Sequence, residues 1–182
     1  MTLTWQIDEA DGTTYWTLTA TQAGYLAFGF GKGGMGSATD PSYVYIGGKD
    51  AASAAAAPFK ITGFSAAAVV AVKPADFPMT VTGVKFEQTA TTASIALVFK
   101  TADIAGYNTM YALGSSNAWA KHTHANSAVF DYRHAPPTPG RDDGRAGADT
   151  GGEPPLVEGH PHFKGHRRID FRGGGAEAHV QG

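Results

Sequence analysis

The first twenty residues alternate between apolar and polar side chains, which is typical of β-strands with one buried face. Positions 2–7 read Thr-Leu-Thr-Trp-Gln-Ile, and positions 15–20 alternate in the same way around Trp16 and Leu18. Asp11-Gly12, between the two segments, is a favoured hairpin turn. The chain is therefore predicted to begin with an antiparallel hairpin.

Short strand patterns continue along the chain and are separated by turn-forming residues. They cover residues 25–30, 43–46, 59–64, 68–72, 81–88, 93–100, 110–113 and 128–132. The segment 93–100 is apolar on both faces, which is typical of a strand inside a sheet. About ten short strands without a long amphipathic helix predict an all-β fold. We expect an immunoglobulin-like antiparallel β-sandwich, with a closed barrel as the alternative architecture.

The composition changes at His134, and this change divides the chain. Residues 134–182 are rich in glycine, proline, arginine and aspartate, and their apolar residues are isolated. Such a segment buries too little apolar surface to offset the loss of chain entropy on folding. The prediction is one β-sandwich domain over residues 1–133, followed by a disordered tail.

Charge and composition exclude several classes of function. The formal net charge of -2 produces no strong electrostatic attraction to nucleic acid or to an anionic membrane surface. There is no cysteine, so disulfides and thiolate metal sites are excluded. No apolar run reaches the roughly 18 residues that a membrane-spanning helix needs. No secretory leader is visible, since residues 2–7 already have a strand pattern.

The stretch from Gly24 to Gly48 combines two strand signals with a glycine-rich loop. Residues 25–30 are apolar, and the loop after them holds one large apolar side chain, Met35, among several glycines. Glycines let the backbone approach a flat partner closely. Met35 is therefore either a plug over the core or a thioether presented to a ligand.

The order of these features resembles the DOMON domain, and in particular its haem-binding branch, to which the cytochrome domain of cellobiose dehydrogenase belongs. The resemblance extends over residues 2–133 and rests on Gly29-Phe30-Gly31, Met35, Asp40, residues 111–115, His122 and residues 129–132. It implies a β-sandwich, a b-type haem and a location outside the cytoplasm. Two explanations are open for the absence of a visible leader: the leader lies upstream of a truncated start, or this copy of the domain is cytosolic.

Haem iron held by one methionine and one histidine is six-coordinate and suited to electron transfer, with no open site for oxygen chemistry. Met35 is the candidate thioether because Met79 and Met110 lie in or next to predicted strands, where methionine usually fills the core. The predicted domain holds two histidines, His122 and His124, and only one of them can face Met35. The family pattern implies His122, with His124 as the alternative.

Four aromatic residues are candidates for the walls of this haem slot: Phe30, Tyr45, Tyr111 and Trp119. Trp119 precedes His122 in the same loop, so it either lines the slot or caps one end of the sandwich. The other three lie within predicted strands, where aromatic side chains more often belong to the core.

The resemblance thus implies a haem b domain that passes single electrons to or from a redox partner, namely a flavin or copper enzyme or a membrane cytochrome. A second hypothesis is a non-redox binding module, in which Trp5, Trp16 and the tyrosines form a stacking platform for a carbohydrate. A third is an interaction domain that keeps the fold without any ligand. The sequence contains no recognisable catalytic signature, and an electron-transfer or binding role is favoured over catalysis.

Overall fold

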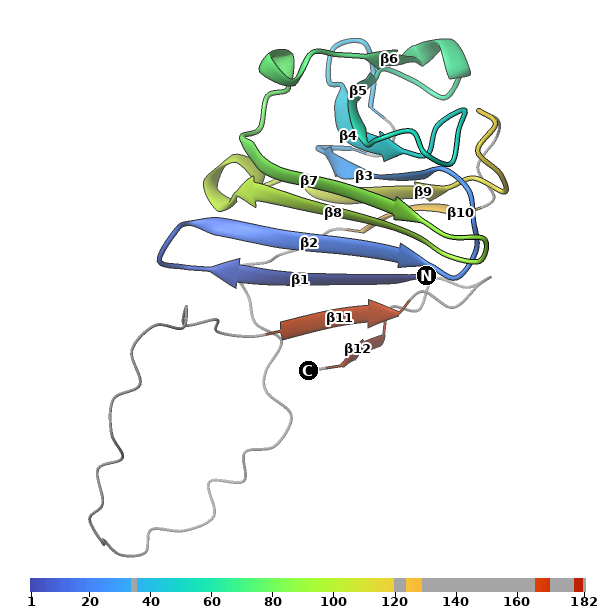
Figure 1. Cartoon of the computed structure of the whole chain (residues 1–182). Coiled ribbons are helices and arrows are strands. Elements are labelled where there is room, and N and C mark those ends of the chain that lie inside the picture. Colours follow the sequence, from blue (N-terminus) through green and yellow to red (C-terminus); the bar gives the residue numbers. More distant parts are fainter. Residues whose placement is uncertain (34–35, 120–123, 129–165, 171–178, 182) are drawn as a thin grey trace, which may run out of the picture.

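The computed structural model describes residues 1–33, 36–119, 124–128, 166–170 and 179–181. Within this part of the chain, two six-stranded antiparallel sheets pack face to face (Figure 1). The first sheet has the strand order β12-β11-β1-β2-β8-β7, and the second has the order β10-β9-β3-β4-β5-β6. The predicted all-β antiparallel sandwich is confirmed.

The N-terminal hairpin and two later strands form the body of the first sheet. These strands are β1 (Thr2–Asp8), β2 (Thr13–Ala20), β7 (Val81–Gln88) and β8 (Ala93–Lys100). The register of β1 and β2 pairs Trp5 with Trp16, which confirms the predicted hairpin. Gly12 in its turn has a φ of 60°, a left-handed conformation that costs glycine little. β8 lies between β2 and β7, as its two apolar faces predict.

The glycine-rich central stretch supplies the middle of the second sheet. Its strands are β3 (Leu26–Gly31), β4 (Ser42–Gly47), β5 (Ala57–Ile61), β6 (Val69–Ala71), β9 (Asn108–Leu113) and β10 (His124–Ala128). β3 pairs with β4 on one side and with β9 on the other. The strand predicted at 128–132 begins earlier than expected, at His124, and its later residues lie outside the described part of the chain.

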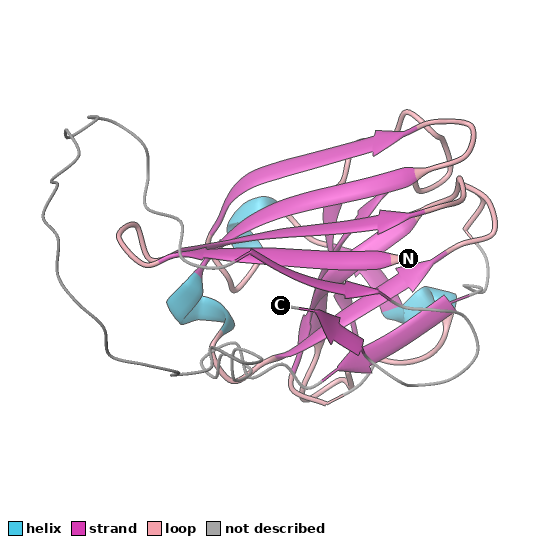
Figure 2. Ribbon diagram, turned by 90° about the horizontal axis from the view of Figure 1, so that it is seen from below, coloured by secondary structure: helices cyan, strands magenta, loops and turns pink. Residues whose placement is uncertain are grey.

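Helical structure in the described residues is limited to three short 3-10 turns (Figure 2). These are η1 (Ala66–Ala68), η2 (Pro74–Asp76) and η3 (Thr101–Ile104). None of the described elements is a helix long and apolar enough to cross a membrane.

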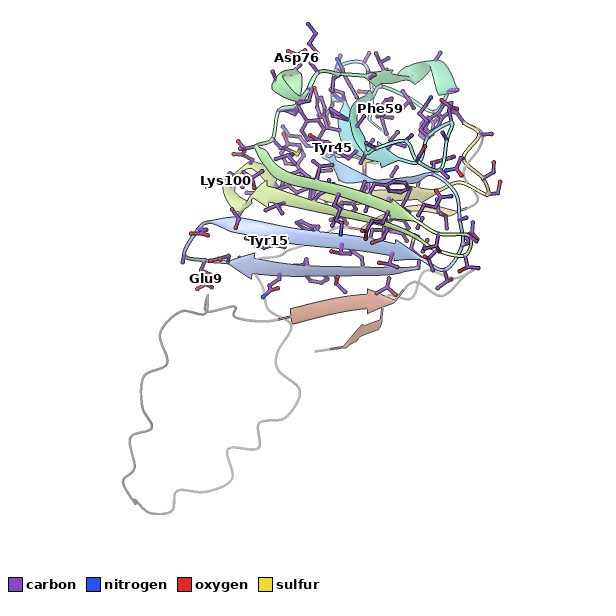
Figure 3. All side chains as sticks on the ribbon, viewed as in Figure 1. Glu9, Tyr15, Tyr45, Phe59, Asp76 and Lys100 are labelled. Carbon is purple, nitrogen blue, oxygen red and sulfur yellow. The ribbon has the colours of Figure 1, made fainter. Side chains whose placement is uncertain are left out.

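Side chains from both sheets fill the space between them (Figure 3). Alternate residues of β3, namely Leu26, Phe28 and Phe30, belong to this core. Trp16 lies at its centre, with its ring centroid 5.4 Å from that of Phe28 and 5.7 Å from that of Phe30. The ring of Phe30 also packs edge-on against Phe99 of β8, 5.0 Å away. The core thus joins β2 and β8 of one sheet to β3 of the other.

Two segments of the tail for which the sequence predicts disorder are strands in the structure. They are β11 (His166–Asp170) and β12 (His179–Gln181), and β11 pairs with β1 so that Ile169 lies opposite Leu3 (Figure 1). Without this pairing β1 would be an edge strand, whose unpaired backbone groups can bind any extended segment. Composition does not reveal such pairing, because the hydrogen bonds join backbone groups.

Candidate functional site

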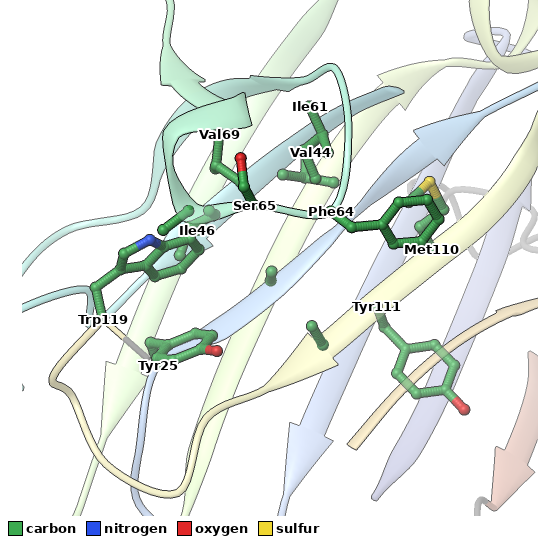
Figure 4. A pocket seen from close by; sticks show the side chains of 13 residues that line it. Tyr25, Val44, Ile46, Ile61, Phe64, Ser65, Val69, Met110, Tyr111 and Trp119 are labelled. Carbon is green, nitrogen blue, oxygen red and sulfur yellow. The ribbon is translucent and has the colours of Figure 1, made fainter. Parts of the chain in front are cut away.

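The outer face of the second sheet, which is turned away from the first sheet, carries an apolar pocket of about 460 Å³ (Figure 4). The residues that line it are Tyr25, Ala27, Val44, Ile46, Ile61, Phe64, Ser65, Ala66, Val69, Met110, Tyr111, Ala112 and Trp119. None of these residues is charged. Pockets that hold small molecules or cofactors measure roughly 300–1,000 Å³, so this pocket is large enough for either.

Small residues of two adjacent strands form the floor of the pocket. Ala27 of β3 and Ala112 of β9 lie opposite each other in the register, and both line the pocket. Gly29 follows two residues after Ala27, on the same face of β3. A Cβ at Gly29 would lie 2.1 Å from the carbonyl oxygen of Tyr43, so only glycine fits there. Because these residues project little above the sheet, the floor is suited to a planar ligand.

Aromatic rings stand at both ends of the pocket (Figure 4). Tyr25 and Trp119 form one end, with their ring centroids 4.9 Å apart, and Phe64 lies beside Met110 at the other end. Gly114 leaves room for the Tyr25 ring, since a Cβ there would lie 2.1 Å from it. Burial raises the pKa of the Tyr25 phenol above its ordinary value of 10.0, so this hydroxyl stays protonated at neutral pH.

Hydrogen bonds fix the loop that carries Trp119. The side-chain amides of Asn117 and Gln88 exchange two hydrogen bonds, of 2.9 and 3.0 Å, which tie the loop to β7 of the first sheet. The backbone N–H of Trp119 donates to the Asp50 carboxylate at 3.3 Å, and the N–H of Asp50 donates to the Asn117 carbonyl at 2.6 Å. A hydrogen bond from Lys49 lowers the pKa of the Asp50 carboxyl, with a smaller contribution from the Trp119 N–H. Trp119 is thus held at the pocket by several contacts.

The four predicted wall residues divide into two groups. Trp119 lines the pocket with its ring; Tyr111 also borders it, but its ring points away from the cavity (Figure 4). Phe30 and Tyr45 belong to the core between the sheets, where Tyr45 packs against Phe77 with centroids 5.0 Å apart. Burial raises the pKa of the Tyr45 phenol. Phe30 and Tyr45 therefore do not line this pocket, because strand alternation turns them to the inner face.

The predicted ligands Met35 and His122 lie outside the described residues. The alternative, His124, is the first residue of β10, and its backbone pairs with Leu113 of β9. A described residue near each ligand in sequence nevertheless lies at the pocket or against one of its lining residues. A Cβ at Gly36, next to Met35, would lie 2.5 Å from the carbonyl oxygen of Ile61, a lining residue. Trp119, in the same segment as His122, lines the pocket itself.

The proposed carbohydrate platform of Trp5 and Trp16 is wrong. Their side chains are 4% and 1% exposed, and their rings stack on each other with centroids 5.5 Å apart inside the core. Both residues lie on the inner face of the first sheet, so neither ring is accessible to a sugar.

Met110 is a pocket residue that the sequence interpretation assigned to the core. It is 5% exposed and shares the outer face of β9 with Ala112. Strand alternation could have identified it. Met110 lies two residues from Ala112, on the same face of β9, and next to Tyr111, whose side chain belongs to the core. Phe64, which is 88% exposed, could not have been found in this way because it follows the end of β5.

Comparison of the chain with models of known protein families, with curated proteins and with solved structures gives no match. Among the residues that the structure describes, no group of three or more histidine, cysteine, aspartate or glutamate side chains could hold a metal ion. The function is therefore inferred from the pocket and from the sequence resemblance.

Proposed function

We propose that this chain is a DOMON-type haem b domain that transfers single electrons, with the outer-face pocket as the haem site and Met35 and His122 as axial ligands. The observation that carries the proposal is an apolar pocket lined by Trp119, which is close in sequence to His122, and by Ile61. Gly36, next to Met35 in sequence, lies against the carbonyl oxygen of Ile61. The uncharged lining and the flat floor around Ala27 suit a planar apolar macrocycle.

The residues of the pocket have distinct tasks in this proposal. Ala27 and Ala112 would leave room for the macrocycle above the sheet, and Val44 and Ile46 would exclude water from it. Trp119 contributes ring contacts at one end. A bound haem with one thioether and one imidazole ligand supplies one-electron chemistry. The electron partner, a flavin or copper enzyme or a membrane cytochrome, and a location outside the cytoplasm are parts of the same proposal.

Haem titration into the purified chain tests the proposal. We expect the sharp visible spectrum of six-coordinate low-spin haem, because methionine and histidine fill both axial positions. Met35→Ala and His122→Ala should each convert it to a high-spin spectrum. Met110→Ala and His124→Ala are the matched controls, since each removes a methionine or histidine side chain at another position of the chain. Both should retain the low-spin spectrum.

The outcomes of this titration separate the function from the choice of ligands. If His124→Ala or Met110→Ala alone abolishes the low-spin spectrum, haem binding stands and the corresponding axial ligand is reassigned. If the unaltered chain gives no low-spin spectrum with haem, the electron-transfer proposal fails.

A non-redox binding module for a small apolar molecule is the second candidate. The uncharged lining and the 88% exposed ring of Phe64 at the pocket favour it. A carbohydrate fits less well, because a sugar needs many hydrogen-bond partners and the lining side chains offer few. Haem affinity that is unchanged in both Met35→Ala and His122→Ala would favour this candidate over the electron-transfer domain.

A further inference from the structure

Lys49 places a positive charge against the ring of Trp119, at one end of a pocket whose lining residues are all uncharged; Lys49 itself is not one of them. Its Nζ lies 5.3 Å from the centroid of the Trp119 ring, and Trp119 lines the pocket. The Lys49 side chain as a whole is 28% exposed, so it is partly shielded from solvent. Such shielding strengthens the interaction of an ammonium group with an anion.

The backbone around Lys49 is held in one conformation. Gly48 and Asp50, on either side, have φ values of 71° and 65°, which form a tight turn after β4. The N–H of Gly48 donates to the Ala54 carbonyl at 2.9 Å, and the Gly48 carbonyl accepts a hydrogen bond from the Asn117 side chain. The backbone that carries Lys49 is therefore fixed, and the ion pair with Asp50 and the contact with the Trp119 ring restrain the ammonium group. This restraint lowers the entropic cost of binding.

The ammonium group of Lys49 has the capacity to bind a second anion. It donates a hydrogen bond to the Asp50 carboxylate, with which it forms an ion pair. A lysine ammonium carries three N–H donors, so this pair leaves donors for another acceptor. The Asp50 side chain is 61% exposed, and solvent screens its charge.

An acidic group on a ligand cannot be buried against the apolar lining without a partner, because an unpaired buried carboxylate is very unfavourable. Lys49 provides that partner at the rim beside Trp119. We infer that the Lys49–Trp119 end of the pocket binds a carboxylate of a planar apolar ligand. This inference rests on the proposed function, since it concerns the ligand of the same pocket, and it specifies that ligand as an amphipathic acid.

Metal-free protoporphyrin IX and its dimethyl ester test this inference, because they share the planar ring and differ in their acid groups. Binding is measured by quenching of tryptophan fluorescence. We expect the full chain to bind the acid at least about tenfold more tightly than the ester, as for one hydrogen bond between charged groups. Lys49→Ala should abolish this preference and leave the affinity for the ester unchanged.

Lys32→Ala is the matched control. Lys32 also lies over an aromatic ring, 5.6 Å from the centroid of Tyr107, which is not among the residues lining the pocket. This variant should keep the preference for the acid. An unchanged ester affinity in Lys49→Ala shows that the variant is folded, so a lost preference cannot be attributed to unfolding.

Three results would overturn the inference: equal affinity of the unaltered chain for acid and ester, an unchanged preference in Lys49→Ala, or binding of neither porphyrin. Neither porphyrin contains iron, so these results do not depend on Met35 or His122. The low-spin spectrum with haem can still be obtained when the carboxylate inference fails, and the two failures are therefore distinguishable.

Discussion

Replacing Trp16 by alanine is expected to lower the free energy of unfolding by about 4 kcal/mol. Trp16 is 1% exposed and contacts the rings of Trp5, Phe28 and Phe30. Its removal therefore leaves a cavity between the two sheets. A typical domain is stable by only about 5–15 kcal/mol, so this loss is a large part of the total. Urea unfolding followed by circular dichroism measures the change as a lower midpoint.

The neighbouring residue Tyr15 provides the control for Trp16. It lies on the same strand, but it is 38% exposed. Tyr15→Ala should cost about 1 kcal/mol or less, because little buried area is lost. Equal effects of the two substitutions would mean that β2 does not bury Trp16 between the sheets, and the arrangement of the sandwich would need revision.

Alanine at Gly29 is expected to destabilise the chain by about 3 kcal/mol or to prevent folding. The added Cβ would lie 2.1 Å from the Tyr43 carbonyl oxygen and 2.5 Å from the Cα of Val44. Both are backbone atoms, so β3 and β4 would have to move apart at the centre of the second sheet. Thermal unfolding should give a clearly lower midpoint, and a folded variant should bind haem more weakly because the pocket floor is distorted.

Gly33 is the matched control for Gly29. A Cβ at Gly33 meets no atom within 4 Å, and this residue also belongs to the glycine-rich stretch. Gly33→Ala should change stability by about 0.5 kcal/mol or less. If Gly29→Ala were equally mild, the close approach of β3 and β4 at the floor of the pocket would be contradicted.

The walls of the pocket and the proposed ligands come from different parts of the chain. Strands β3, β4 and β9 provide the floor and the apolar walls, whereas Met35 and His122 belong to segments that follow β3 and precede β10. Substitutions in the floor should therefore change stability and haem affinity together, whereas substitutions of the ligands should change mainly the haem spectrum.

The alternation of apolar and polar residues was sufficient to predict the all-β fold, the N-terminal hairpin and the central position of β8. Trp119, whose ring lines the pocket, was instead selected by its position just before His122 in the sequence. Period-two alternation assigns residues to two faces of a strand, but it does not say which face is covered. For this reason Phe30 and Tyr45 remained candidates for the haem slot, although they belong to the core.

The sequence by itself thus determined the strands of the first 113 residues, their alternation and the resemblance that suggests Met35 and His122 as ligands. Only the tertiary structure decided that the outer face of the second sheet carries an apolar pocket, that Trp5 and Trp16 are buried, and that β11 pairs with β1. The physical reason is that each of these features depends on contacts between segments far apart in the chain. Local patterns of side chains carry no information about which distant strand becomes a neighbour.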